Sequence, residues 1–187
     1  TQLVGGTQFV GLENYTRAFA DPQFWDGVGR VSLFLVVQVP IMLGIAMLVA
    51  LAIDSGRLYG KDFFRISVFM PYAVPAVVAA LMWGFMYGPR FGLLGYINDF
   101  FGWSIPNPLG PEWILLAIGN IVTWSFVGYN MLIFYSSLRT IPASLYEAAS
   151  IDGAKEHHVI RHIKMPAISG SIAVALIFSI IGSFQLF

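Results

Sequence analysis

Residues 28–53 read VGRVSLFLVVQVPIMLGIAMLVALAI, a run in which Arg30 is the only charged side chain. A membrane-spanning helix needs about 20 consecutive, mostly apolar residues. Three further segments meet this requirement, residues 66–87, 113–138 and 167–187. One such run could form a buried helix of a soluble protein, but four in succession predict an all-α polytopic membrane protein with about four transmembrane helices.

The composition of the whole chain supports this interpretation. Of 187 residues, 57% are hydrophobic and 11% are charged, against about 25% charged in soluble domains. Ten basic and ten acidic residues cancel, so the chain has no bulk attraction to nucleic acid. It contains no Cys, which excludes disulfides and thiolate-ligated metals.

The two ends of the sequence lead us to expect an excerpt of a longer protein. The first residues, TQLVGGTQFVGLENYTRAF, lack the basic and apolar regions of a signal peptide. The last residues, SGSIAVALIFSIIGSFQLF, stay apolar up to Phe187 without a polar flank. We therefore expect residues 1–187 to form one transmembrane domain whose flanking spans lie outside this sequence.

The orientation follows from the basic residues between the spans. Seven of the ten Lys and Arg residues lie in residues 54–65 and 139–166. Short loops rich in Lys and Arg stay in the cytoplasm, so these two segments are predicted to be cytoplasmic. Residues 1–26 and 88–112 are then predicted to face outward. Within the latter, Leu93–Phe101 is predicted to form a short interfacial helix that anchors the chain to the bilayer.

The interiors of the four spans lack ionisable groups, which argues against several functions. Proton relays, voltage sensors and intramembrane enzymes need polar or charged groups at depth. The prolines Pro40, Pro71 and Pro75 lie within or near the spans, and they permit a kinked or broken helix because proline frees a carbonyl group.

Neutral polar and aromatic side chains remain in the third and fourth spans. Asn120, Thr123 and Asn130 share one helical face at this spacing. Two interpretations are equally supported: hydrogen bonds between helices, or a site for a neutral, hydroxyl-rich solute that stacks on aromatic rings and bonds to amides. The candidate residues for a substrate pathway are Asn120, Trp124, Tyr129, Asn130, Ser179 and Ser183.

The chain carries no complete nucleotide or metal motif. The stretch from Gly56 to Lys61 has three residues between its glycines where a phosphate-binding loop has four, and Asp62 replaces the required hydroxyl. The chain is therefore predicted not to be an ATPase. His158 and His162 have helical spacing, but they lack an obvious third ligand, so solvated or interface histidines are favoured, as for the neighbouring His157.

Residues 139–166 are predicted to form a polar hairpin of two short helices. Ser144 and Glu147 have the spacing of a capping box, which predicts a first helix over 143–151. Gly153 is predicted to supply a turn, and a second helix over 155–163 is predicted to stop at Pro166. An inert connector and a DNA-binding helix-turn-helix are the alternatives. Balanced charges and tethering at both ends argue against DNA.

The hairpin sequence resembles a known family. Residues 147–154 read EAASIDGA and residues 163–166 read IKMP, which is similar to the E-A-A-x-x-D-G-A and I-x-L-P pattern of binding-protein-dependent ABC importer permeases. Met165 replaces the usual Leu, and Ile160 stands where an aromatic residue is common. Residues 9–15, FVGLENY, also resemble an element of the carbohydrate-uptake branch that includes maltose and glycerol-3-phosphate permeases.

The resemblance implies a type I importer permease fold and a set of partners. These are a second, similar permease subunit, a cytoplasmic ATPase dimer that binds ATP and Mg²⁺, and an extracytoplasmic solute-binding protein. The hairpin would dock on the ATPase, with Glu147 meeting a basic residue and Gly153 forming the turn. The residues that the pattern assigns to this coupling role are Glu147, Ala148, Ala149, Asp152, Gly153, Ala154, Ile163 and Pro166.

The expected function is import of a sugar through the inner membrane of a prokaryote. A glycerol-phosphate or other polyol is the alternative substrate. An anionic ligand would need Arg, Lys or a helix N-terminus at its site, and no Lys or Arg lies deep in these spans. From a different class, a scaffold that does not transport remains the alternative, although it would have no use for a docking hairpin.

Overall fold

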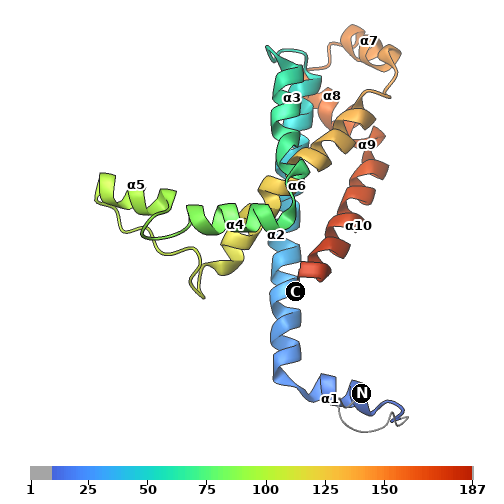
Figure 1. The fold of residues 1–187 in the computed structure, drawn as a ribbon. Helices are drawn as coiled ribbons and strands as arrows, with labels where there is room; N and C mark the ends of the chain where they lie inside the picture. Colours follow the sequence, from blue (N-terminus) through green and yellow to red (C-terminus); the bar gives the residue numbers. More distant parts are fainter. Residues whose placement is uncertain (1–9, 187) are drawn as a thin grey trace.

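The computed structural model describes residues 10–186, which form helices and connecting loops (Figure 1). Helices α2 and α6 cross at the centre, α10 lies beside them, and α7 projects from one end. The elements are α1 (Glu13–Ala20), α2 (Pro22–Asp54), α3 (Lys61–Phe69), η1 (Met70–Ala73), α4 (Ala76–Met86), α5 (Leu93–Phe101), α6 (Ile114–Leu138), α7 (Ala143–Ile151), α8 (Glu156–Val159), η2 (Ile160–Lys164), α9 (Met165–Ala167) and α10 (Ser169–Leu186).

Helix α2 confirms the first predicted span and extends it at its start. Asp21 caps the helix by accepting a hydrogen bond from the Gln23 backbone N–H at 2.9 Å. Pro22 occupies the first helical position, where a missing N–H costs nothing. The helix then continues through Pro40 to Asp54.

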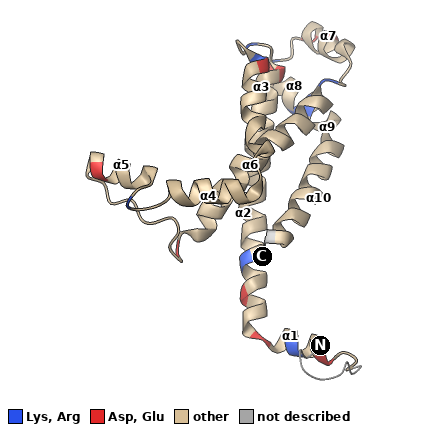
Figure 2. Cartoon of the chain, in the orientation of Figure 1, with Lys and Arg blue, Asp and Glu red and all other residues tan. Residues whose placement is uncertain are grey.

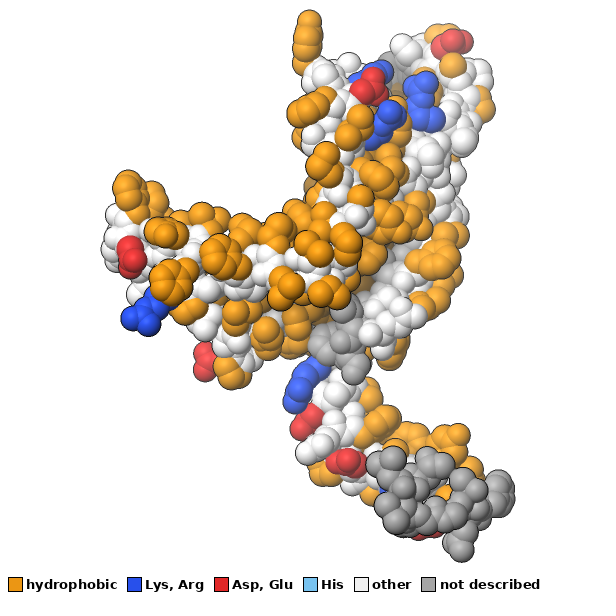
Figure 3. Space-filling model, viewed as in Figure 1, with side chains coloured by type: hydrophobic (Ala, Val, Ile, Leu, Met, Phe, Trp, Pro, Cys, Tyr) orange, Lys and Arg blue, Asp and Glu red, His pale blue; other side chains and the backbone are white. Residues whose placement is uncertain are grey.

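The core lies where α2 packs against α6 and α10. Ala46 and Ala50 are fully buried in α2, and their small side chains let α6 approach closely. Met131 and Phe134 of α6 fill the space, and Ala175 of α10 closes the cluster. Most other apolar side chains lie on the outside, as Figure 3 shows over α4 and the central helices, which suits a lipid environment.

The second predicted span, residues 66–87, is broken and does not form one continuous helix, as its prolines permitted. The segments Lys61–Ala73 and Ala76–Met86 meet at an angle of 98°. The break lies between two prolines: Pro71 is the second residue of the 3₁₀ turn η1, and Val74 adopts an extended conformation before Pro75. A residue that precedes proline is disfavoured in the helical region, which explains where the helix stops.

The fourth span also begins differently from the prediction, because Pro166 does not end the preceding helix. Residues Ile160–Lys164 form a π-helical turn, and the helix continues through Pro166 to Ala167. The wide turn is bonded from the Met165 N–H to the Ile160 carbonyl, a local adjustment that accommodates the missing proline N–H. The bend of 65° between this segment and α10 lies at residue 168.

The first hairpin helix matches its prediction, but its cap does not. Helix α7 spans Ala143–Ile151, with Pro142 at the cap position. Ser144 therefore lies inside the first turn and makes no capping bond, so the predicted capping box is wrong. Gly153 does form the predicted turn: its φ is +69°, its N–H bonds to Ser150, and the next N–H bonds to Ala149, a Schellman motif.

Charged side chains gather at the ends of the bundle and near α5, and the middle carries none (Figure 2). The two loops predicted to be cytoplasmic, residues 54–65 and 139–166, lie at the same end, while α1 lies at the other. The helix predicted over Leu93–Phe101 is present as α5. Because α4 turns away from the bundle, α5 lies to one side and not at the end with α1.

Candidate functional site: a neutral cavity and a polar hairpin

A cavity of about 400 Å³ opens between α2, η1, α4, α6 and α10. This volume falls in the range of about 300–1,000 Å³ that is usual for small-molecule sites. Its described lining is apolar and aromatic, with several neutral polar groups and no Lys, Arg, Asp, Glu or His. The polar members of the lining are Gln38, Tyr72, Tyr129, Asn130, Ser179, Ser183 and Gln185.

Two tyrosines form an aromatic wall of the cavity. The rings of Tyr72 and Tyr129 stack with centroids 4.8 Å apart and planes 18° apart. Phe126 meets Tyr72 edge-on at 5.9 Å. The 3₁₀ turn η1 carries Tyr72, so the broken second span is what places this ring against α6.

Asn130 and Ser183 supply buried polar groups. Asn130 is 3% exposed and donates to the Phe126 carbonyl at 3.0 Å. The Ser183 hydroxyl donates to the Ser179 carbonyl at 2.8 Å. These bonds satisfy one donor of each side chain inside its own helix. Within residues 10–186, no donor bonds to the Asn130 side-chain oxygen, so the oxygen keeps its acceptor capacity for a solute.

Gln38 is a cavity residue that the sequence reasoning missed. Its side-chain amide donates to the Gly119 carbonyl at 2.6 Å and to the Thr123 hydroxyl. It therefore joins α2 to α6 beside the cavity. The available signal was a lone amide in an apolar span, two residues before Pro40. Tyr72 was also missed, and its signal was a polar aromatic residue between two prolines.

Two of the six pathway candidates lie outside the cavity lining. The Asn120 amide donates to the Tyr87 hydroxyl at 2.7 Å, and Trp124 meets Trp83 edge-on with centroids 5.8 Å apart. Both contacts are with the α4 segment. The structure thus brings together the other four candidates, Tyr129, Asn130, Ser179 and Ser183.

The hairpin places the residues predicted to have a coupling role at the far end of α6. Glu147 is exposed and makes no ion pair within the described part of the chain. Beside it, the apolar side chain of Ile151 is 87% exposed. Of the remaining coupling candidates, Ala148, Asp152, Gly153 and Pro166 are exposed, Ala154 and Ile163 are half-buried, and Ala149 is buried.

Ionic contacts join the base of the hairpin to the end of α2. Lys164 pairs with Asp54 at 2.6 Å, and Arg57 pairs with Glu156 at 2.7 Å. The ring of Tyr146 lies 5.7 Å from the Lys164 ammonium group. Burial raises the pKa of the Tyr146 phenol above its usual 10.0, and the Asp54 charge raises it further, while Arg139 lowers it. Sequence reasoning missed this cluster.

The three histidines of the hairpin lie together without forming a metal site. The rings of His157 and His158 are 4.0 Å apart, and the His162 Nδ1 lies 3.1 Å from the His158 carbonyl. Among the residues that the structure describes, no three His, Asp or Glu side chains are placed to hold a metal ion.

Comparison with known families identifies the chain. Residues 42–187 match the family described as binding-protein-dependent transport system inner membrane component. The chain belongs to this family. The resemblance of the hairpin to importer permeases is thereby confirmed, and so is the prediction of a membrane protein. This is a family of transport-system membrane components and not of enzymes.

Several relatives in the inner membrane component family are one third identical to the chain. The diacetylchitobiose uptake system permease of Streptomyces coelicolor is 33% identical over 91% of the chain and 52% of its own length. The sn-glycerol-3-phosphate transport system permease of Agrobacterium fabrum is 33% identical over 95% of the chain and 60% of its own length. The lactose transport system permease of Rhizobium radiobacter is 33% identical over 96% of the chain and 61% of its own length. The chain thus spans about half to three fifths of these relatives.

A solved structure shares the fold of this family member. The crystal structure of a bacterial alginate ABC transporter, in complex with an alginate pentasaccharide-bound periplasmic protein, matches with a TM-score of 0.77 at 22% identity. The match covers 91% of this chain and 60% of that one. The predicted all-α importer permease fold is therefore confirmed.

Proposed function

We propose that the chain is part of the membrane-spanning permease subunit of an ATP-driven importer that translocates a sugar. The protein would lie as a multi-pass subunit in the cell membrane of a prokaryote. Support comes from family membership and from relatives whose names include uptake systems for diacetylchitobiose and lactose. The observation that carries the substrate class is the cavity, which combines stacked tyrosine rings with amide and hydroxyl groups and has no charged residue in its described lining.

The chemistry of the cavity favours a neutral, hydroxyl-rich solute. A sugar presents an apolar ring face and several hydroxyl groups around its edge. The rings of Tyr72 and Tyr129 can contact the face, and the oxygen of Asn130 can accept from a hydroxyl. An ionised ligand would be desolvated here without a compensating basic side chain in the lining, which is costly in a low-dielectric site.

A phosphorylated polyol is the second candidate, and one observation favours it. Ala76 is the first residue of α4 and lines the cavity. The first backbone N–H groups of a helix have no partner within the helix, and broken helices in transporters direct such ends at anionic groups. One relative is named as an sn-glycerol-3-phosphate permease.

We propose further that the hairpin of residues 139–166 is the docking element for a cytoplasmic ATPase dimer, which would bind ATP and Mg²⁺. A second, homologous permease subunit and an extracytoplasmic solute-binding protein would complete the assembly. Support comes from the exposed position of Glu147 and Ile151 and from the placement of the hairpin at the same end as the basic loop after α2.

An uptake experiment tests both the function and the cavity. The full-length protein, assembled with its partners in vesicles, is assayed with labelled sugars and with sn-glycerol 3-phosphate. Asn130→Ala is compared with Asn120→Ala, a matched control on the same helix outside the cavity lining. We expect the first to lower uptake about tenfold, as the loss of one good hydrogen bond allows, and the second to change it less than about twofold.

The outcomes separate the candidates. Uptake of sugar alone supports the neutral substrate, and uptake of the phosphorylated polyol alone supports the second candidate. Absence of ATP-dependent uptake of either class would refute the importer assignment. A larger loss for Asn120→Ala than for Asn130→Ala would refute the assignment of the substrate pathway to the cavity.

A further inference from the structure

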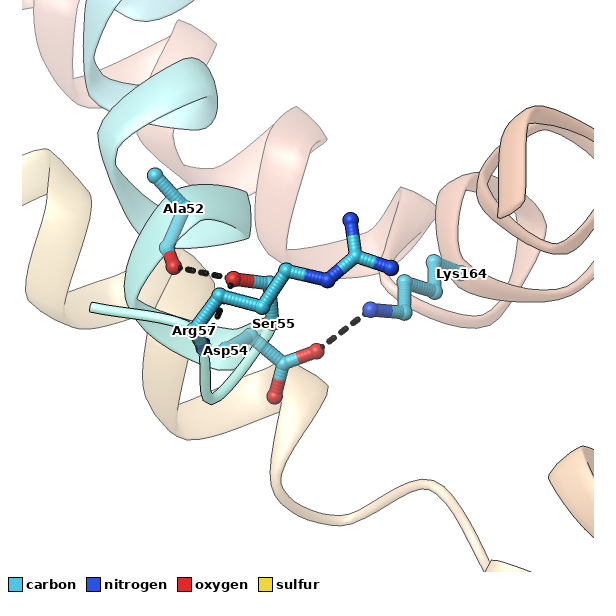
Figure 4. A network of polar contacts seen from close by, with 5 residues as sticks. All are labelled: Ala52, Asp54, Ser55, Arg57 and Lys164. Carbon is cyan, nitrogen blue, oxygen red and sulfur yellow. Dashed lines mark hydrogen bonds and ion pairs between the residues drawn. The ribbon is translucent and has the colours of Figure 1, made fainter.

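The inner end of α2 carries a buried ion pair that the transport assignment does not explain. The Asp54 carboxylate and the Lys164 ammonium group lie 2.6 Å apart, and each side chain is only 10% exposed (Figure 4). Among the described residues, Lys164 is the only charged residue that is classed as buried. A buried charge is strongly unfavourable without its partner, so the two residues are expected to stay together.

The local structure around Asp54 makes the partner necessary. Asp54 is the last residue of α2, where the helix dipole already concentrates negative charge. The Ser55 hydroxyl donates to the Ala52 carbonyl at 2.7 Å, and the Arg57 N–H donates to the Ser55 hydroxyl at 3.3 Å. These bonds fix the turn that holds Asp54. The Lys164 charge offsets both the carboxylate and the helix end.

Lys164 occupies an equally particular place on the returning arm of the hairpin. It is the last residue of the π-helical turn Ile160–Lys164, a conformation that is rare and often found at functional sites. Four residues later, at residue 168, the chain bends into α10. The ring of Tyr146, from α7, lies over the Lys164 ammonium group at 5.7 Å. The pair therefore contacts both arms of the hairpin.

The connectivity of the hairpin shows what the pair adds. The chain joins the hairpin to α6 through residues 139–142 and to α10 through residues 165–168. The hairpin has no direct covalent connection to the nearby end of α2, because Asp54 and Lys164 are 110 residues apart along the chain. The exposed pair Arg57–Glu156 makes a second contact, but its side chains are 79% and 48% exposed, so water and salt weaken it.

We propose that Asp54 and Lys164 are a positioning pair that fixes the hairpin to α2, so that a movement of the hairpin is transmitted to α2 as well as to α6 and α10. The proposal rests on the docking function of the hairpin. It assigns no contact with solute or nucleotide to either residue. Their role is to hold the returning arm of the hairpin in one register against α2.

A distance measurement tests the link without any transport assay. The chain contains no native Cys, so spin labels can be placed at Leu48→Cys on α2 and Ile151→Cys on the hairpin, both exposed. In the full-length complex, any cysteine outside this sequence is replaced. We expect one narrow distance distribution in the parent protein, a broadened or shifted one in Asp54→Asn, and no change in Arg57→Gln, the matched control from the exposed pair.

A coupling measurement tests the consequence. The readout is solute transported per ATP hydrolysed in vesicles. We expect Asp54→Asn to lower this ratio about tenfold or more, since it leaves Lys164 buried without a partner. Arg57→Gln should stay within about twofold. The reversed pair Asp54→Lys with Lys164→Asp should recover a large part of the ratio, because it restores an ionic contact at the same place.

The double variant Asp54→Leu with Lys164→Met separates positioning from stability. Replacing both members of a buried ion pair with apolar residues often preserves stability, so this variant remains testable where Asp54→Asn fails to fold. We expect a folded complex with a lowered transport ratio and a broadened distance distribution. Normal coupling together with an unchanged distance distribution would overturn the proposal. A parent complex that imports nothing would refute the importer function, while the distances would still test the pair.

Discussion

Gly128 of α6 is predicted to be the least replaceable glycine of the bundle. A Cβ atom built at this position would lie 2.1 Å from the Val68 carbonyl oxygen and 2.6 Å from the Phe69 Cα. Both obstacles are backbone atoms of α3, so a rotamer change cannot relieve them. Contacts of this kind below 3.0 Å do not occur in practice. The substitution Gly128→Ala must therefore move α3 away from α6 by about 0.9 Å.

The magnitude follows from two opposing terms. Overpacking of a close contact costs about 1–3 kcal/mol, and a backbone obstacle places this case near the upper end. Replacing glycine by alanine inside a helix returns up to about 1 kcal/mol. We expect a net destabilisation of about 2 kcal/mol. The matched control is Gly44→Ala in α2, whose Cβ would meet nothing within 4 Å. It should gain about 0.5–1 kcal/mol.

Thermal unfolding of the purified protein in detergent measures the difference. The melting temperature of Gly128→Ala should fall, and that of Gly44→Ala should be unchanged or higher. Because α3 leads into η1, the displaced backbone should also disturb the stack of Tyr72 on Tyr129 and reduce uptake. A Gly128→Ala protein that melts and transports like the parent would refute the close approach of α3 to α6.

Three further outcomes are expected. Gly153→Val forces a branched side chain into a positive φ of +69°, a strain of about 1–2 kcal/mol; it should lower transport per ATP and lower the melting temperature by a few degrees. Gln38→Leu removes the bond to the Gly119 carbonyl and should cost about 0.6–1.7 kcal/mol in thermal unfolding. Burial first, and the Asp54 charge second, raise the Tyr146 pKa above 10.0. The folded state thus favours the neutral phenol, which adds to the free energy of unfolding. This contribution is complete below pH 10 and is lost as the pH rises through the higher folded pKa. Tyr146→Phe should therefore flatten the alkaline decline of the melting temperature above about pH 10.

Local sequence signals predicted much of the fold. The bounds of α5 and α7 match their predictions, because glycine and proline mark their ends within one or two residues. The spans α2 and α6 were recognised from long apolar runs. The positive φ of Gly153 also followed from its place after a short helix. In each case the deciding interactions lie within a few residues along the chain.

The features that sequence reasoning missed depend on contacts between distant residues. The prolines permitted a break in the second span, but no local signal gives its angle of 98° or the close approach of α3 to Gly128. The partner of Asp54 lies 110 residues away, and no spacing rule links the two. Asn120 shares a helical face with Asn130, yet α4 turns toward it and binds it through Tyr87. The periodicity of a sequence predicts which residues share a face of a helix, but it does not predict which segment packs against that face.

Helix α2 is 33 residues long, or roughly 50 Å at 1.5 Å per residue, and so exceeds the hydrocarbon core of about 30 Å. One end carries Asp54, and the other continues to Asp21 and α1. A rod of this length that tilts by about 10° around its inner end displaces its outer end by about 9 Å. A rotation small enough to preserve the contact with Lys164 thus produces a large displacement at the opposite membrane surface, which makes α2 a lever between the two faces.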